Sequence, residues 1–255
     1  MTFLRHTWVM TERHVMRLIR QPWYIAVTLV QPIIWLLLYG ALFRRAVEIP
    51  GFQSDSYIQF LAPGVIVMSA LFSSGWGGMA LIDDLNRGVI DRFLVTPVSR
   101  APLILGRLVQ AAIVVVVQSA IIVLLAMATG ARFQSLPGVA VLILVAAMVG
   151  AAFGAISYAI ALLARREETV IAVMNFTLLP LTFLSAGFMQ KDLMPDWMQR
   201  VADFNPVNWA VEAGRVPAAG GDWGFVGLRV ALLAGFLVLG LAASTSAFRA
   251  YQRSA

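Results

Sequence analysis

Long uncharged apolar runs, separated by short polar segments, set the pattern of the whole chain. A transmembrane helix needs about 20 mostly apolar residues, and these runs are of that length or longer. The pattern therefore predicts six transmembrane helices, whose boundaries we place at residues 24–43, 58–82, 102–128, 137–164, 169–189 and 223–248.

The composition excludes a water-soluble globule. Hydrophobic residues make up 60% of the 255 residues and charged residues 13%, whereas a soluble domain is about 45–50% apolar and about 25% charged. The mean hydropathy of +0.82 agrees. The chain has no cysteine, so disulfides, thiol nucleophiles and thiolate metal sites are excluded.

The distribution of basic residues predicts the orientation of the spans. Six spans place both termini on one side, and the segments on that side carry 12 arginines, against 7 basic residues in the opposite segments. Because cytoplasmic loops carry the excess of Lys and Arg, both termini are expected in the cytoplasm. We attribute the net charge of +6 to this topology and expect no nucleic-acid partner.

The first 22 residues have helical periodicity and are expected to form an amphipathic helix on the cytoplasmic membrane surface. The alternative is an ordinary basic flank that only orients the first span. The apolar face holds Trp8, Val15, Met16 and Ile19, and the basic face holds Arg13, Arg17 and Arg20.

The span interiors lack chemistry-bearing side chains. Arg107 and Arg229 lie near span ends, and His6 and His14 precede the first span. A proton-coupled carrier needs ionisable groups at depth, and a serine hydrolase needs a base beside its nucleophile. No His-Glu-x-x-His zinc motif and no phosphate-binding loop is present. We therefore predict no catalytic or metal-binding residue, and energy for uphill transport must come from a partner.

Residues 83–107, after the second span, contain a short amphipathic helix at 88–96 that Pro97 ends. Pro102 is placed to open the third span. Two interpretations are equally open: docking into a groove of a soluble partner, or an interfacial helix lying among lipid headgroups. The apolar arc is Val89, Ile90, Phe93 and Leu94, and the polar arc contains Asp91, Arg92 and Thr96.

Residues 190–222 are too polar to span the membrane but are patterned as two short helices. The first begins at Pro195, Asn205-Pro206 ends it, and the second covers 209–215. The apolar face of the first is Trp197, Met198, Val201 and Phe204, opposite Asp196, Gln199, Arg200 and Asp203.

The loop Gly-Val-Ile-Asp-Arg-Phe-Leu-Val-Thr-Pro-Val-Ser-Arg at 88–100, followed by Leu-Gly-Arg at 105–107, resembles the permease subunit of ABC-2 type exporters, particularly of the daunorubicin-exporter kind. Three further runs support the same resemblance: Leu-Ala-Pro-Gly at 61–64, Phe-Asn-Pro at 204–206 and Glu-Ala-Gly-Arg at 212–215. The resemblance covers nearly the whole chain. It implies one all-α integral membrane domain of the ABC-2 (type V exporter) class, with a cytoplasmic coupling helix at 83–101 and an external re-entrant helix pair at 190–222.

The resemblance also implies partners: a second permease copy, forming a homodimer, and two copies of an ATP-binding subunit that hold ATP and magnesium. The chain itself is expected to bind no cofactor and not to be an enzyme. The residues implied to contact the ATP-binding subunit are Asp84, Arg87, Gly88, Asp91, Arg92, Phe93, Pro97 and Arg100.

A central cavity between the two permeases, lined by the second and fifth spans, is implied as well. Spacings of four residues place the candidates of each span on one helix face. Methionine and aromatic side chains accommodate varied amphiphiles, although ordinary helix packing or lipid contact is the alternative for each residue. The candidates are Met68, Phe72, Asn175, Leu179 and Phe183.

The function expected is export of a hydrophobic or amphipathic compound, such as a drug, an antibiotic or a lipid-like molecule, across a bacterial inner (plasma) membrane. Export of a lipid-linked glycan or polysaccharide is an alternative. A non-transporting sensor or scaffold coupled to an ATPase is an alternative of another class.

Overall fold

The computed structural model describes residues 22–52, 54, 56–87, 101–218 and 221–254, and all secondary structure in these residues is helical. The prediction of an all-helical protein is confirmed. The predicted surface helix at 1–22 lies outside the described residues except for its last residue. The helices are α2 (Pro22–Leu42), α3 (Tyr57–Gly75), α4 (Gly77–Asn86), α6 (Ala101–Ala128), α7 (Leu136–Ala164), α8 (Glu167–Phe183), α9 (Asp196–Asp203), α10 (Pro206–Ala218) and α11 (Trp223–Ser254), with short 3-10 helices η1 (Arg44–Glu48) and η2 (Lys191–Leu193).

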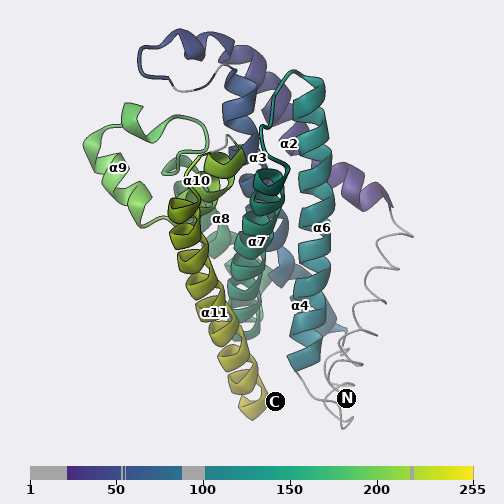
Figure 1. Cartoon of the computed structure of the whole chain (residues 1–255). Helices are drawn as coiled ribbons and strands as arrows, with labels where there is room; N and C mark the ends of the chain where they lie inside the picture. The colour runs from purple at the N-terminus through teal and green to yellow at the C-terminus, as the bar shows by residue number, and fades with distance from the viewer. Residues whose placement is uncertain (1–21, 53, 55, 88–100, 219–220, 255) are drawn as a thin grey trace.

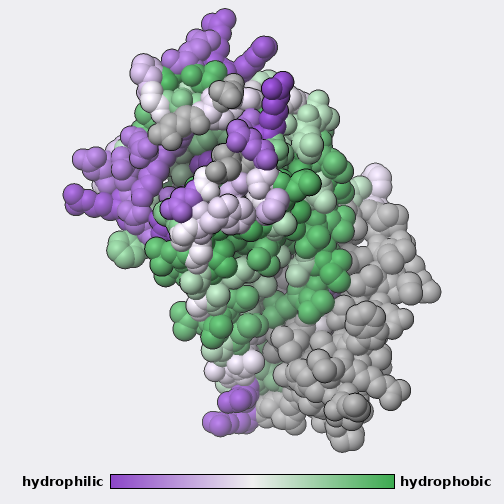
Figure 2. All heavy atoms as spheres, in the orientation of Figure 1, coloured by the Kyte–Doolittle hydropathy of each residue, from purple (hydrophilic) through white to green (hydrophobic). Residues whose placement is uncertain are grey.

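Four helical stretches are long and apolar enough to cross a membrane: Tyr57–Asn86, Gly106–Ala128, Leu136–Ala164 and Trp223–Tyr251. The apolar part of α2, Ala26–Leu42, is shorter, and α8 has 17 residues. Figure 2 shows hydrophobic residues between a hydrophilic upper end and a hydrophilic lower tip. The chain is therefore a multi-pass membrane protein, and the six-span topology stays a prediction.

Helix α7 forms the centre of the bundle and packs against α3, α6, α10 and α11 (Figure 1). Its small residues permit close approach: a Cβ added at Gly150 would lie 2.8 Å from Ser74 Oγ of α3. A Cβ added at Gly240 of α11 would lie 2.9 Å from the Ala152 carbonyl oxygen. Helices in lipid associate through such tight van der Waals packing, because burying apolar groups gives little driving force there.

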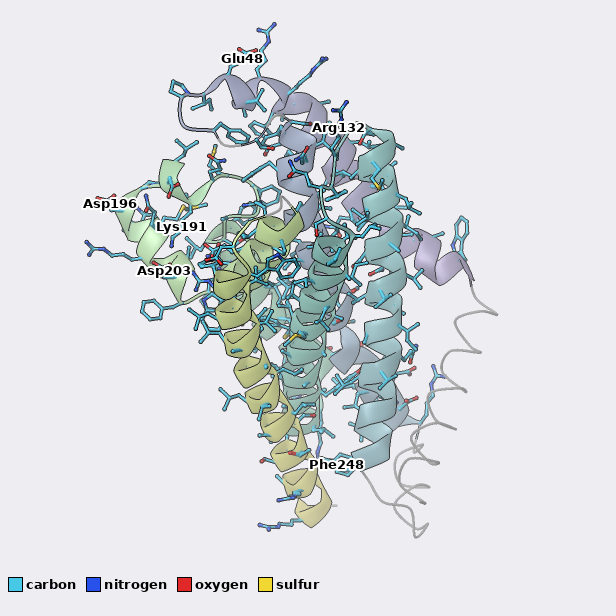
Figure 3. The ribbon with its side chains drawn as sticks, in the orientation of Figure 1. Glu48, Arg132, Lys191, Asp196, Asp203 and Phe248 are labelled. Carbon is cyan, nitrogen blue, oxygen red and sulfur yellow. The ribbon has the colours of Figure 1, made fainter. Side chains whose placement is uncertain are left out.

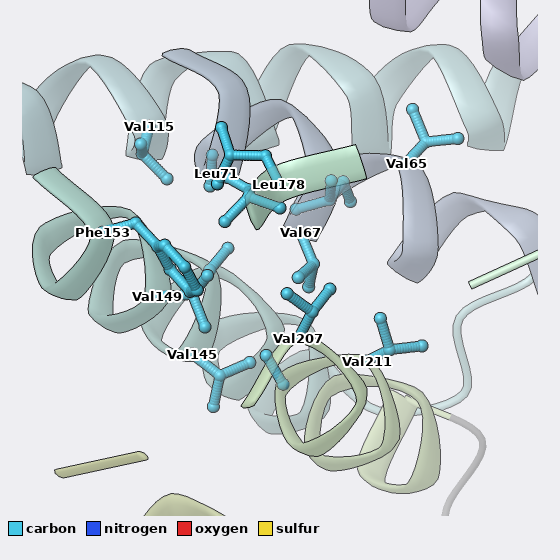
Figure 4. Close-up of a cluster of buried hydrophobic side chains, with 14 of the residues drawn as sticks. Val65, Val67, Leu71, Val115, Val145, Val149, Phe153, Leu178, Val207 and Val211 are labelled. Carbon is cyan, nitrogen blue, oxygen red and sulfur yellow. The ribbon is translucent and has the colours of Figure 1, made fainter. Parts of the chain in front are cut away.

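The buried core lies where α7 meets α3, α8 and α10 (Figure 4). Val149 and Phe153 of α7 pack in the same cluster as Leu71 of α3 and Leu178 of α8. Val207 places α10, which the sequence assigned to a polar hairpin, in this same core. The hairpin is thus anchored in the bundle by apolar burial.

The second predicted span, 58–82, is two helices that meet at Trp76. Glycines flank this residue on both sides, and glycine weakens a helix interior. The backbone N–H of Gly78 donates to Ser157 Oγ of α7 at 3.0 Å. The break is therefore held by a hydrogen bond to the central helix.

The fifth predicted span, 169–189, is wrong at its end, because α8 stops at Phe183. Pro180 lies in the last turn and lacks an N–H for the helical ladder. The Leu184 N–H donates to the Pro180 carbonyl at 2.8 Å and closes that turn. The chain then turns back through 184–190 without regular helix.

Gly64 in the Leu-Ala-Pro-Gly run permits contact between α3 and the turn after α8. A Cβ added there would lie 2.5 Å from the Gly187 carbonyl oxygen, whereas a Cβ at Gly227 of α11 meets nothing within 4 Å. We expect Gly64→Ala to reduce the free energy of unfolding by about 1–3 kcal/mol. Gly227→Ala, the matched control, is expected to leave it unchanged or raise it by about 0.5–1 kcal/mol. Thermal unfolding in detergent, followed by tryptophan fluorescence, measures both, and equal effects would contradict the close packing.

Candidate functional site

The loop predicted to couple the chain to a partner joins α4 to α6. Residues 88–100 lie outside the described residues, so the structure does not place six of the predicted contact residues: Gly88, Asp91, Arg92, Phe93, Pro97 and Arg100. Asp84 and Arg87, at the edge of the loop, are described.

Two ion pairs of different burial lie at this edge. Asp84 of α4 pairs with Arg107 of α6, and their side chains are 28% and 16% exposed. Arg87 pairs with Asp83 at 2.9 Å, one turn away on the same surface, and both of these side chains are largely exposed. The Asp84–Arg107 pair therefore ties together the two helix ends from which the loop extends.

We expect Asp84→Asn to lower stability by about 1–2 kcal/mol, because it removes the charge from a partly buried ion pair with Arg107. Asp83→Asn is the matched control: exposed pairs contribute about 0–1 kcal/mol, so the change should be small. Midpoints of thermal unfolding at low and high salt measure both variants. A larger loss of stability for Asp83→Asn than for Asp84→Asn would show that the Asp84–Arg107 pair does not hold the two helix ends together.

An aromatic cluster at the α2, α3 and α8 faces brings together two of the predicted cavity residues. Phe72 of α3 and Phe183 of α8 do not touch directly. Trp35 of α2 lies with its ring centroid 6.0 Å from Phe72 and 6.0 Å from Phe188. The Phe188 ring in turn stacks with Phe183 at 6.0 Å.

A groove of about 120 Å³ lies between α2 and α3 beside this cluster. Its walls combine aromatic rings with hydroxyl and amide groups. Gln118 of α6 donates from Nε2 to Thr28 Oγ1 at 2.8 Å. Ser69 Oγ and Gln118 Oε1 are buried and have no hydrogen-bond partner among the described residues. The groove is lined by Thr28, Gln31, Pro32, Trp35, Ser69, Phe72, Ser73 and Trp76.

The remaining predicted cavity residues occupy different environments. Leu179 and Phe183 lie on the exposed face of α8, with side chains 44% and 62% exposed, and Asn175 is half-buried on the same row. Met68 is fully buried and packs against Gly187, so it does not line the groove. Sequence reasoning did not select Trp35, Gln31 or Ser69; the available signal was the occurrence of polar residues within apolar runs.

The hairpin after α8 supplies hydrogen bonds to the irregular chain that follows this helix. Asn205 Nδ2 donates to the carbonyls of Leu181 and Leu184, at 2.7 and 2.9 Å. Asn208 Oδ1 accepts from the Ala186 N–H at 2.9 Å. Buried main-chain groups need partners in an apolar environment, and side chains from a segment about 20 residues later provide them here.

A charged network continues from this point into α10 and α11. Asn208 Nδ2 donates to Glu212 Oε1 at 3.0 Å, and Glu212 Oε2 pairs with Arg229 of α11 at 2.8 Å. Arg215 Nη2 donates to the carbonyls of Phe60 and Ala186, at 3.1 and 2.7 Å. Burial lowers the pKa of Arg215 to about 9, against the opposing attraction of Glu212, so this guanidinium stays charged at neutral pH.

The apolar face predicted for the first hairpin helix is exposed to the surroundings of the chain. On and just after α9, Trp197 is 60% exposed and Phe204 82% exposed. Tryptophan is enriched at membrane–water interfaces, and the position of α9 beside the bundle end suits such an interface (Figure 1).

Residues 5–217 match the family model described as ABC-2 type transporter. The chain belongs to the ABC-2 type transporter family. The ABC-2 permease is 30% identical to the daunorubicin resistance ABC transporter permease protein DrrB1 of Streptomyces coeruleorubidus, over 92% of this chain and 82% of that protein.

Other relatives are more distant in identity but comparable in coverage. A ycf38 protein of Cyanophora paradoxa, described as a transport permease, is 28% identical over 88% of this chain and 77% of that protein. Nodulation protein J of Sinorhizobium fredii is 26% identical over 78% of this chain and 74% of that protein. The ABC-2 family is one of membrane permeases, which work with an ABC ATP-binding subunit.

Proposed function

We propose that the chain is the membrane-spanning permease subunit of an ATP-driven exporter that moves a hydrophobic or amphipathic compound out of a bacterial cell. The functional unit is two permease copies and two ATP-binding subunits in the plasma membrane. Each permease has six spans and cytoplasmic termini. The observation that carries the proposal is the similarity to a daunorubicin resistance permease along nearly the full chain.

The coupling loop would transmit the closure of the ATP-binding subunits to the spans. The Asp84–Arg107 pair links α4 and α6, the two helices that the loop joins. A push on the loop therefore acts on both helix ends at once. Because α4 is separated from α3 by the break at Trp76, α4 would tilt relative to α3 when the hydrogen bond between Gly78 and Ser157 opens.

The transport path would run along the faces of α3 and α8 that carry the predicted cavity residues. Phe72 and Phe183 belong to one aromatic cluster through Trp35 and Phe188. Aromatic faces hold flat apolar ligands by stacking and dispersion, and the unpaired Ser69 hydroxyl nearby provides a hydrogen-bonding group. This combination suits an amphipathic aromatic compound better than a glycan, whose many hydroxyls need many polar partners.

Two measurements in cells test the proposal. Affinity purification of the tagged chain from native membranes is expected to recover an ATP-binding protein in a one-to-one ratio. Deleting the gene is expected to raise the cellular accumulation of daunorubicin, used as a probe, and re-expression to restore it. Copurification without any effect on a panel of amphipathic drugs would favour the sensor or scaffold instead.

A further inference from the structure

A pocket of about 590 Å³ lies at the end of the bundle opposite the C-terminal end of α11. It is separate from the groove between α2 and α3. Five segments form it: the start of α3, the loop between α6 and α7, the turn after α8, α10 and the start of α11. Its size falls within the range of about 300–1,000 Å³ that is typical of small-molecule sites.

Arg215 lines the pocket and has no carboxylate partner among the described residues. Its Nη2 is used by two carbonyls, and its guanidinium carbon lies 3.8 Å from the centre of the Phe60 ring. Its Nε has no hydrogen-bond partner, and it forms no ion pair with a carboxylate in the part of the chain that the structure describes. A partly buried cation without a carboxylate partner favours an anionic ligand.

The pocket lining carries more positive than negative charge. Its basic residues are Arg132, Lys191 and Arg215, and its acidic residues are Asp192 and Glu212. Arg132 is exposed at the pocket and forms no ion pair among the described side chains, whereas Lys191 pairs with Asp203. Glu212 also lines the pocket but is neutralised by Arg229 at 2.8 Å. Figure 3 shows Arg132, Lys191 and Asp203 at this same end of the molecule.

Two further features of the pocket indicate the chemical class of its ligand. The Gln190 side chain lines the pocket and is 9% exposed, and its Oε1 lacks a donor among the described groups. A ligand hydroxyl would satisfy it. The wall also has an apolar part, formed by Phe60, Pro63, Phe133 and Phe225, and further polar side chains at Ser54, Gln59 and Gln134. The pocket also lies where the apolar helices begin, at Tyr57, Leu136 and Trp223, which is the depth of the lipid headgroups in a membrane.

We propose that this pocket binds the acidic, hydroxyl-bearing headgroup of an amphiphile, with Arg215 and Arg132 holding its oxyanion. A phospholipid headgroup and a free phosphate share the oxyanion, and the competition experiment below distinguishes these two sources. The proposal goes beyond the transport function. Binding is measured on the chain alone without ATP, so the result does not depend on whether the chain exports anything.

The test is a binding titration of the purified full chain in detergent micelles, followed by native mass spectrometry. Dioctanoyl phosphatidylglycerol, which offers a phosphate and hydroxyls, is the probe, and dioctanoyl phosphatidylcholine is the control lipid. We expect phosphatidylglycerol to bind at least about fivefold more tightly. Millimolar inorganic phosphate added as a competitor distinguishes the sources: displacement assigns recognition to a free oxyanion, and its absence assigns recognition to the headgroup of the amphiphile.

Charge variants locate the site. Arg132→Gln is expected to weaken phosphatidylglycerol binding about two- to fivefold, and Asp192→Asn, which removes a lining carboxylate, to tighten it by a similar factor. Arg215→Gln should weaken it by about tenfold or more, because a partly buried charge-assisted contact is lost. Arg200→Gln on α9 is the matched control, since this exposed arginine does not line the pocket.

The Arg132 and Asp192 side chains are exposed, so these two variants keep the test valid if Arg215→Gln fails to fold. Equal affinity for the two lipids would overturn the proposal. Phosphatidylglycerol binding that Arg132→Gln and Asp192→Asn leave unchanged would overturn it too.

Discussion

Replacing Asn205 by leucine is expected to reduce the free energy of unfolding by about 3–5 kcal/mol. The substitution keeps the branched shape of the side chain but removes three hydrogen bonds: those to the Leu181 and Leu184 carbonyls, and the one from the Val207 N–H to Oδ1 at 2.9 Å. The side chain is 2% exposed, so water does not replace these partners. Each buried group left unpaired costs about 1–3 kcal/mol.

The measurement is thermal unfolding of the purified chain in detergent, with Asn175→Leu as the matched control. Asn175 is half-buried on α8 and has no hydrogen bond to a described residue in the structure. Its replacement is expected to change stability little. Asn205→Asp separates the donated hydrogen bonds from the accepted one, because aspartate still accepts from the Val207 N–H but cannot donate to the two carbonyls. A midpoint for Asn205→Leu equal to that of Asn175→Leu would contradict the capping role of Asn205.

Replacing Phe93 by alanine is expected to reduce ATP-driven export by tenfold or more. In the predicted amphipathic helix at 88–96, Phe93 is the largest side chain of the apolar arc. A large aromatic anchor at a protein interface typically contributes about 2–4 kcal/mol, which corresponds to a loss of about 30-fold or more in affinity. Weaker docking of the ATP-binding subunit would remove the force that drives the spans.

The matched control is Val98→Ala, which shortens an apolar side chain in the same loop but beyond Pro97. Both variants should insert into the membrane in normal amounts. Export of daunorubicin and recovery of the ATP-binding subunit in a pull-down should fall only for Phe93→Ala. If export falls while the recovery of the subunit is unchanged, the helix lies in the headgroups rather than in the partner.

The apolar pattern predicted the helices well where each lies along one uncharged run. Helices α6 and α7 begin within one residue of the predicted spans and end at the predicted residues, Ala128 and Ala164. For these two helices, hydropathy and the residues at the helix start are enough to predict the bounds. Pro137 lies in the first turn of α7, and the Ser135 side chain caps it by accepting from the Gly138 N–H.

The end of α8 could not be predicted in this way. The residues after Phe183 are still apolar enough to read as helix, and the groups that stabilise the turn are Asn205, Asn208 and Arg215. Their contacts are made across about 20 to 30 positions in the sequence. A hydropathy pattern is local and carries no information about such contacts.

The candidate site was also predictable only in part, because sequence spacing shows which residues share a helix face but not which other helix they meet. Spacing of four residues placed Asn175, Leu179 and Phe183 on one face of α8, but it could not show that Met68 faces Gly187 inside the bundle. Arg215 was recognised only as part of a motif. Its insertion over the Phe60 ring depends on the packing of α10 against α3.

The most direct test of the account is transport into inverted membrane vesicles that contain the chain together with its copurifying ATP-binding protein. The account predicts that daunorubicin accumulates against its gradient only when ATP is added. It also predicts that accumulation stops when the lysine of the phosphate-binding loop in the ATP-binding protein is replaced by alanine. Accumulation in vesicles that contain this chain alone, or without ATP, would contradict it.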